Sequence, residues 1–145
     1  MRSRACGVTD ADLVAKKLAA IETWVTELRR LSRPEEIARD VREERFVEHT
    51  LQIAIQAALD VASHIASDER LGEPRTHRQL FELLSRAGWL DEGLAASLRD
   101  MAGFRNILVH GYAEVDTRIV RDMVEHRLGD LLAFVAAIRA RIPAR

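Results

Sequence analysis

The stretch of sequence that decides the fold is residues 43–66, EERFVEHTLQIAIQAALDVASHIA. One set of apolar side chains recurs in it at spacings of three and four residues: Val47, Leu51, Ala54, Ala58, Val61 and Ile65. That period is the period of an α-helix. Further apolar residues at Ile53, Ile55 and Leu59 lie off this stripe, so we expect a helix that is buried on more than one side.

A second amphipathic helix precedes this one. Thr9 followed by Asp12 has the pattern of a helix N-cap, and a stripe of apolar residues follows it: Val14, Leu18, Ile21, Val25 and Leu28. This helix is predicted to end near Leu31. Ser32 and Glu35, around Pro34, form a capping-box pattern that predicts a short helical segment reaching about Val41.

Three more helices are expected after residue 66, behind a loop at residues 67–75 that contains Gly72 and Pro74. The first is predicted to begin at Thr76, with Gln79 completing its cap, and to stop at Gly88. The second begins at Asp91 and stops at Gly111. The last begins at Asp116 or Thr117. No segment alternates in the manner of a strand. The sequence therefore predicts an all-α, up-and-down helical bundle of four long helices plus one or two short ones.

Composition points to one ordinary globular domain. A chain of 145 residues can bury a core without disulfides or metal, so residues 1–145 are predicted to form a single domain with frayed ends at 1–8 and 142–145. The lone cysteine, Cys6, indicates a reducing compartment. No signal peptide and no apolar run of about 20 residues is present. We therefore expect a cytoplasmic protein with no membrane contact.

One arginine breaks the apolar pattern of the helix predicted from Asp91. Leu94, Leu98, Met101 and Leu108 form its stripe, and the slot between the last two holds Arg105. An arginine in a stripe that faces a core or a partner is costly unless it is paired or used. A local failure of the pattern is typical of functional sites.

Polar residues close to Arg105 suggest what this site could do. Asn106 and His110 are four residues apart and share a helix face, whereas Arg105 and His110 are about 140° apart on an ideal helix. They could converge if the helix loosened at residues 109–111 or if a second subunit contributed. Arginine binds phosphate and histidine transfers protons near neutral pH, a combination that suits an RNA phosphodiester. The alternative is structural: Arg105 pairs with Asp60 or Asp100, and His110 caps a helix end.

The string RNILVHGY at residues 105–112 resembles the signature of the HEPN superfamily, and in this extended form it resembles the HepT toxins of HepT/MntA-type toxin–antitoxin pairs. The resemblance extends over nearly the whole chain, from the early helix through residues 59–65 and 81–84 to the final long helix. One departure is the string His77-Arg78-Gln79, which stands where an aromatic residue is expected.

The resemblance implies a HEPN-like fold and a metal-independent endoribonuclease that needs no cofactor. Arg105 and His110 would be catalytic, and Asn106 would help to orient them. It implies RNA as the substrate, a homodimer that brings two motifs into one cleft, and a nucleotidyltransferase antitoxin (MntA-like) as the partner. That antitoxin would block the cleft by AMPylation of Tyr112, the only tyrosine in the chain.

Two further readings remain open at this stage. The chain could be a non-catalytic helical subunit that binds and regulates a nucleotidyltransferase, or a structural bundle with an incidental motif. Asp60 and His64 could form half a metal site, but no second pair completes it, so no metal is predicted. Glu48, His49 and Asp60 could lie near the cleft. We expect His77 and His126 on the surface, and the two tryptophans in packing roles.

Overall fold

The computed structural model describes residues 2–110 and 115–142, with side chains from residue 11 onward. Its elements are α1 (Arg2–Leu31), the 3₁₀ turn η1 (Pro34–Glu36), α2 (Val41–Asp68), α3 (His77–Arg86), α4 (Glu92–His110), α5 (Thr117–Asp122), the π-helical segment η2 (Met123–Arg127) and α6 (Leu128–Arg141). These residues contain no strand. The predicted all-α class is confirmed.

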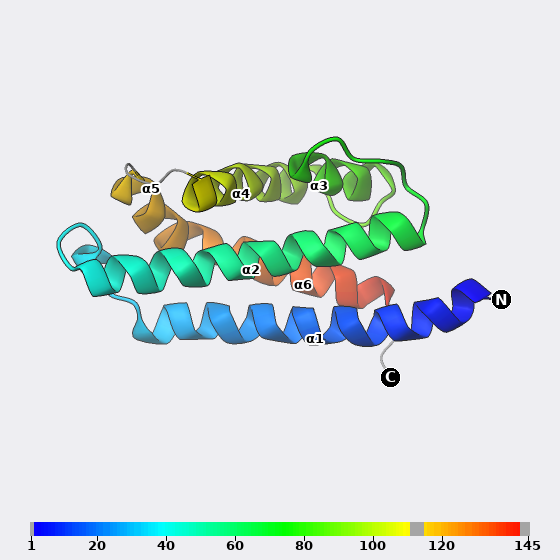
Figure 1. Cartoon of the computed structure of the whole chain (residues 1–145), viewed down its shortest axis with the longest axis horizontal. Helices are drawn as coiled ribbons and strands as arrows, with labels where there is room; N and C mark the ends of the chain where they lie inside the picture. Colours follow the sequence, from blue (N-terminus) through cyan, green and yellow to red (C-terminus); the bar gives the residue numbers. More distant parts are fainter. Residues whose placement is uncertain (1, 111–114, 143–145) are drawn as a thin grey trace.

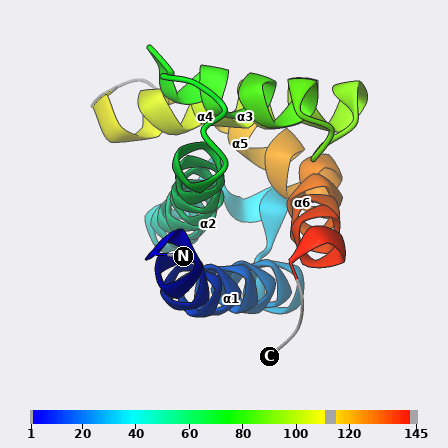
Figure 2. The same cartoon turned by 90° about the vertical axis from the view of Figure 1, so that its right-hand side faces the viewer.

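The long helices run up and down beside one another. Figure 1 shows α1, α2, α4 and α6 alternating in direction, and Figure 2, which looks along the bundle, shows α2 and α6 between α1 on one side and a layer of α3 and α4 on the other. The short α3 packs on α4, and both contact α2. The predicted bundle is confirmed, and its α3–α4 layer crosses obliquely over α2.

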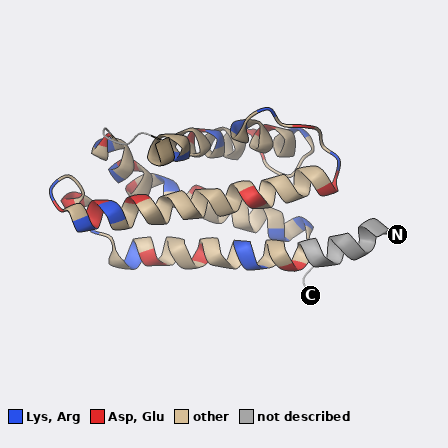
Figure 3. Ribbon diagram, in the orientation of Figure 1, with Lys and Arg blue, Asp and Glu red and all other residues tan. Residues whose placement is uncertain are grey.

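The core is built from the stripes that the sequence predicts. Every member of the α1 stripe is buried, from Val14 to Leu28, and so is every member of the α2 stripe. Ile55 and Leu59 are buried too, which confirms that α2 is covered on more than one side. Figure 3 shows that the central part of α2 carries no charged residue. Trp89 is buried and Trp24 packs against the core, as expected.

Aromatic contacts and ion pairs connect elements that are far apart in the sequence. Phe81 of α3 meets Phe134 of α6 edge to face, with ring centroids 5.9 Å apart. The guanidinium of Arg141 lies 4.2 Å from the centroid of the Trp89 ring, which fixes the end of α6 against the α3–α4 turn. Two hydrogen bonds of 2.7 and 2.8 Å join Arg139 to the carboxylate of Glu22 on α1. The α3–α4 layer is therefore attached to the bundle at its end as well as through α2.

Several predicted helix boundaries are confirmed by their caps. The side chains of Thr76, Asp91 and Asp116 each accept a backbone N–H at the start of α3, α4 and α5. Gly88 follows the end of α3 with φ +86°, a conformation that favours glycine. Asp40 caps α2 in the same way, by accepting from the backbone N–H groups of residues 42 and 43.

Other boundaries differ from the prediction. α1 begins at Arg2, well before the expected cap at Thr9. The capping box at Ser32 is wrong, because no side chain caps η1 and the Ser32 N–H donates to the carbonyl of Leu28 at 3.1 Å. The neighbouring Arg33 N–H donates to Glu43 of α2, at 2.6 Å. The last helix is interrupted by η2. The predicted stop at Gly111 lies outside the described residues, and the fraying of the chain ends stays a prediction.

Across the described residues, none of the helices combines the length and the apolar character that crossing a bilayer requires.

Candidate active site

Arg105 occupies the anomalous position on α4 that the sequence predicts. Leu98 and Met101 of the same stripe are buried, and Leu108 packs against the core with partial exposure. Arg105 is half-buried, and its Nε atom is buried with no hydrogen-bond partner. A buried donor without a partner costs free energy, so the position is maintained at the expense of stability.

The structural alternative for Arg105 is not supported. Asp60 is bound by Lys17 at 3.2 Å and by the amide of Gln56 at 2.8 Å. Asp100 is paired with Arg127 at 3.4 Å. The side-chain contact of Arg105 is a hydrogen bond from Nη1 to Oδ1 of Asn106, at 3.1 Å. Within the part of the chain that the structure describes, no carboxylate neutralises this guanidinium.

Arg105, Asn106 and His110 line one open groove of about 610 Å³. α4 stays helical up to His110, so no loosening of the helix before that residue is needed to bring the three side chains to the same space. Arg105 and His110 line the same groove although an ideal helix would place them about 140° apart. Arg105 and His110 therefore share one cavity within a single chain.

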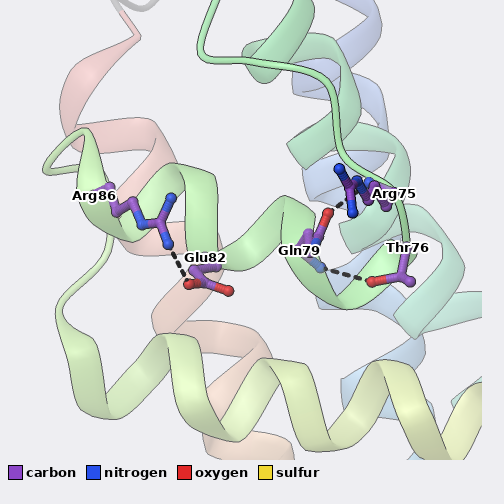
Figure 4. A network of polar contacts seen from close by, with 5 residues as sticks. All are labelled: Arg75, Thr76, Gln79, Glu82 and Arg86. Carbon is purple, nitrogen blue, oxygen red and sulfur yellow. Dashed lines mark hydrogen bonds and ion pairs between the residues drawn. The ribbon is translucent and has the colours of Figure 1, made fainter.

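The other side of the groove comes from the α2–α3 connection. It is lined by Ser63 of α2 and by Pro74, Arg75, Thr76, His77 and Leu80. The connection leaves α2 through Arg70 and Gly72, both of which have positive φ. It is then anchored at α3, where Gln79 donates its backbone N–H to Thr76 and accepts the N–H of Arg75 at 2.5 Å (Figure 4). This reciprocal pair of bonds fixes the backbone at residues 75–77.

The electrostatic character of the groove is that of an anion site. Two arginines and two histidines line it, and none of the described lining residues is a carboxylate. The α2–α3 connection carries both acidic and basic residues (Figure 3). Of these charged residues, Arg75 lines the groove. Guanidinium groups match the geometry of phosphate oxygens, so the arrangement favours a phosphorylated ligand.

His77 was expected on the surface, and it is indeed exposed, but it also lines the groove. Sequence reasoning missed its place in the groove because residues 77 and 105 belong to different helices, and no periodicity relates them. The one available signal was the departure at residues 77–79, where the string His77-Arg78-Gln79 stands in place of an expected aromatic residue. His126 is on the surface as predicted, with its side chain 68% exposed.

The other candidate residues lie outside this groove. Asp60 and His64 line an adjoining hollow of about 400 Å³ with Lys17, and Ser63 borders both spaces. Asp60 is engaged by Lys17, and no group of three potential metal-ligating side chains occurs among the described residues. Glu48 and His49 do not line either space. Tyr112 lies outside the described residues.

Glu48, near the start of α2, has an unusual carboxyl group. Burial raises its pKa, and a hydrogen bond to Glu44 and the charge of that carboxylate raise it further, to about 7. One of its oxygens is buried without a hydrogen-bond partner. This group affects the pH dependence of stability and does not belong to the anion site.

Comparison with known proteins identifies the family. The model of the family described as Ribonuclease HepT-like matches residues 18–138. The chain is 31% identical over 130 residues to the mRNA nuclease HepT of Shewanella oneidensis, an alignment that covers 89% of this chain and 98% of that protein. The chain belongs to the HepT-like ribonuclease family. Its enzyme class is endoribonuclease.

Two further matches are similar to this chain, one in sequence and one in structure. The tRNA nuclease HepT of Aphanizomenon flos-aquae is 30% identical, over 66% of this chain and 65% of that protein. The solved structure of a tri-AMPylated Shewanella oneidensis HEPN toxin in complex with its MNT antitoxin matches with a TM-score of 0.83 and 30% identity, over 90% of this chain and 98% of that one. The chain therefore shares its fold with a toxin that is seen bound to its antitoxin.

Proposed function

We propose that this HepT-like protein is the ribonuclease toxin of a toxin–antitoxin pair and that it cleaves RNA in the groove between α4 and the α2–α3 connection. Arg105 binds the scissile phosphate, His110 transfers a proton, and Asn106 holds the guanidinium of Arg105 in place through its 3.1 Å hydrogen bond. The observation that carries the proposal is the presence of these three side chains in one groove that no described carboxylate lines.

The chemistry that fits this groove is transesterification. The 2′-OH of ribose is an internal nucleophile: its oxygen bonds to phosphorus, the bond from phosphorus to the 5′-oxygen breaks, and the products are a 2′,3′-cyclic phosphate and a 5′-OH. The reaction requires a cation for the phosphate charge, which Arg105 supplies, and proton transfer at both oxygens. Neither requirement involves a metal ion, so we expect cleavage to be metal-independent.

We further propose that a nucleotidyltransferase antitoxin controls this groove by AMPylation of Tyr112. Tyr112 follows His110 by two residues in the sequence, so a nucleotide attached to it would place negative charge close to the groove. That charge would compete with RNA phosphate for Arg105. The tri-AMPylated Shewanella oneidensis toxin, in complex with its MNT antitoxin, supports this mode of control.

A homodimer is part of the same proposal. Ile107 of α4 and Ile119 of α5 are exposed large apolar residues, with 49% and 46% exposure, on the two elements that flank residues 111–114. We propose that these two side chains contact the second copy of the chain. RNA and the antitoxin would meet this dimer in the cytoplasm.

Cleavage of end-labelled RNA by the purified protein in the presence of EDTA tests the catalytic proposal. We expect cleavage by the wild type and by His126→Ala, whose side chain lies outside the groove, and none by Arg105→Ala or His110→Ala. Circular dichroism should show the same helix content in all four proteins. Undiminished cleavage by both groove variants would refute the site.

Co-expression with an MntA-like nucleotidyltransferase antitoxin tests the control mechanism. Intact-mass spectrometry should detect additions in multiples of one adenylyl group on the wild type and none on Tyr112→Phe. Additions that persist on Tyr112→Phe would place the modification elsewhere.

A further inference from the structure

The proposed catalytic residues occupy one wall of a groove that is larger than a phosphate group requires. Arg105, Asn106 and His110 all belong to α4. The groove has a volume of about 610 Å³, and its second wall is formed by Ser63 and residues of the α2–α3 connection and α3. Sites that bind whole small molecules have volumes of about 300–1,000 Å³. The second wall is therefore available to another part of the RNA.

This second wall combines apolar side chains with one aromatic ring. Pro74 is half-buried, Leu80 is buried and His77 is exposed, and all three line the groove. His77 and Leu80 are three residues apart on α3, so they share a helix face. Among the described residues, no side chain holds the imidazole of His77 by a hydrogen bond or an ion pair. The ring is therefore available to a ligand.

The backbone around His77 is fixed relative to α4. On one side of it, the side chain of Gln79 accepts the N–H of Arg75 at 2.5 Å (Figure 4). On the other side, Arg78 packs over Gly103 of α4, with Nη1 3.8 Å from the point that a Cβ on that glycine would occupy. The start of α3 is thus held against the helix that carries the proposed catalytic residues.

Attack by the 2′-OH creates a need for such a surface. An in-line displacement requires the attacking and departing oxygens on opposite sides of phosphorus, a geometry that a regularly stacked strand does not have. The nucleotide at the cut must therefore leave its stack, and proteins stabilise an unstacked base by placing it on an aromatic side chain, histidine included. The tryptophan and phenylalanine rings of the described residues are buried or pack against the core. His77 is the ring on the second wall that remains for this role.

We propose that His77 is a nucleobase platform: the base of a nucleotide next to the scissile phosphate stacks on its imidazole, bordered by the apolar side chains of Pro74 and Leu80. This role rests on the proposed ribonuclease function. Arg75, on the same wall, meets a neighbouring phosphate. Stacking uses the face of the ring and not its proton, so the role does not depend on which copy of the chain supplies the proton-transfer groups in a shared cleft. Every base has a π-face, so the platform accepts all four bases.

The test uses strands with one ribonucleotide among 2′-O-methyl nucleotides, because only that position has the 2′-OH nucleophile and the register is then fixed. The strand has the sequence around a site that the wild type cleaves in unmodified RNA. It is made intact, with hydrogen in place of the base of the ribonucleotide, and with hydrogen in place of the next base on the 3′ side. Cleavage yields kcat/KM for the wild type, His77→Ala, His77→Phe and the matched control His126→Ala, whose exposed histidine lies outside the groove.

On the intact strand, His77→Ala should lower kcat/KM about tenfold, the order expected for loss of one base–aromatic stack. His77→Phe should stay within about threefold of the wild type, because a phenyl ring stacks without exchanging a proton. One of the two base deletions should lower kcat/KM of the wild type by a similar factor and have no further effect on His77→Ala, since both changes remove the same contact. His126→Ala should match the wild type on every strand.

Three results would overturn the platform while leaving the ribonuclease function intact: undiminished kcat/KM in His77→Ala, an equal loss in His77→Phe, or losses from His77→Ala that add to those from both base deletions. Failure of the wild type to cleave any RNA would instead refute the proposed function on which the platform rests.

Discussion

Replacement of Arg105 by methionine should make the protein more stable and inactive at the same time. Methionine keeps an unbranched apolar stem of similar length but removes the guanidinium. The buried Nε without a partner costs about 1–3 kcal/mol, and the exposed bond to Asn106 contributes about 0.5–1 kcal/mol, so the substitution should stabilise the fold by about 1 kcal/mol. For a chain of this size, that corresponds to a rise in Tm of about 3 °C.

Arg127→Met is the matched control, because Arg127 also has a buried Nε without a partner. Its guanidinium additionally binds Asp100 at 3.4 Å, and it does not line the groove. Loss of that ion pair offsets part of the gain, so we expect a Tm within about 2 °C of the wild type and undiminished cleavage.

The assay is thermal unfolding followed by circular dichroism at one protein concentration, together with the RNA cleavage assay. If Arg105→Met lowered the stability by 2 kcal/mol or more, Arg105 would be a structural residue and our account of the α4 stripe would be wrong. Full activity in that variant would refute its role as the phosphate ligand.

Two further perturbations follow from the same structure. Arg75→Ala removes a cation that lines the groove, so it should weaken binding of a 2′-O-methyl RNA strand about tenfold. It should also reduce the slope of the logarithm of the binding constant against the logarithm of salt concentration by about 0.7. Arg86→Ala, at the other end of α3 and paired with Glu82 (Figure 4), should change neither quantity in the same fluorescence-anisotropy titrations. Glu48→Gln should flatten the pH dependence of Tm. The pKa of Glu48 is raised from 4.5 to about 7, so the folded state binds the proton more tightly, and its contribution is fully present below pH 4.5 and lost as pH rises through 7. Melting curves at pH 5 and pH 8 should show a smaller loss for the variant than for the wild type, and Glu35→Gln, an exposed control, should behave as the wild type does.

Local signals in the sequence predicted most of the helices correctly. Caps at Thr76, Asp91 and Asp116 work because a side-chain oxygen satisfies an N–H group only two or three residues away. The box at Ser32 failed because the Ser32 N–H, which Glu35 would have to accept, donates to the carbonyl of Leu28 at 3.1 Å as α1 runs on to its end. The pattern from Ser32 to Glu35 does not include Leu28, so it cannot show that the preceding helix already satisfies this donor.

For the catalytic candidates too, the sequence predicted local features and missed contacts between elements. Arg105 was detectable because a charged residue interrupted a heptad stripe, and a stripe is a property of one helix. The absence of a carboxylate partner was not detectable, because Asp60 and Asp100 are bound by Lys17 and Arg127 from other elements.

By itself, the sequence determined the helices, their buried faces and the position of Arg105 and His110 on α4, since each of these depends on residues within a few turns of one another. Only the tertiary structure decided that Arg105 is left without a counter-charge and that His77 shares its groove. The first depends on Lys17 of α1 and Arg127 of η2, which bind Asp60 and Asp100. The second depends on how the α2–α3 connection lies beside α4. Such contacts between distant segments are set by the packing of whole helices.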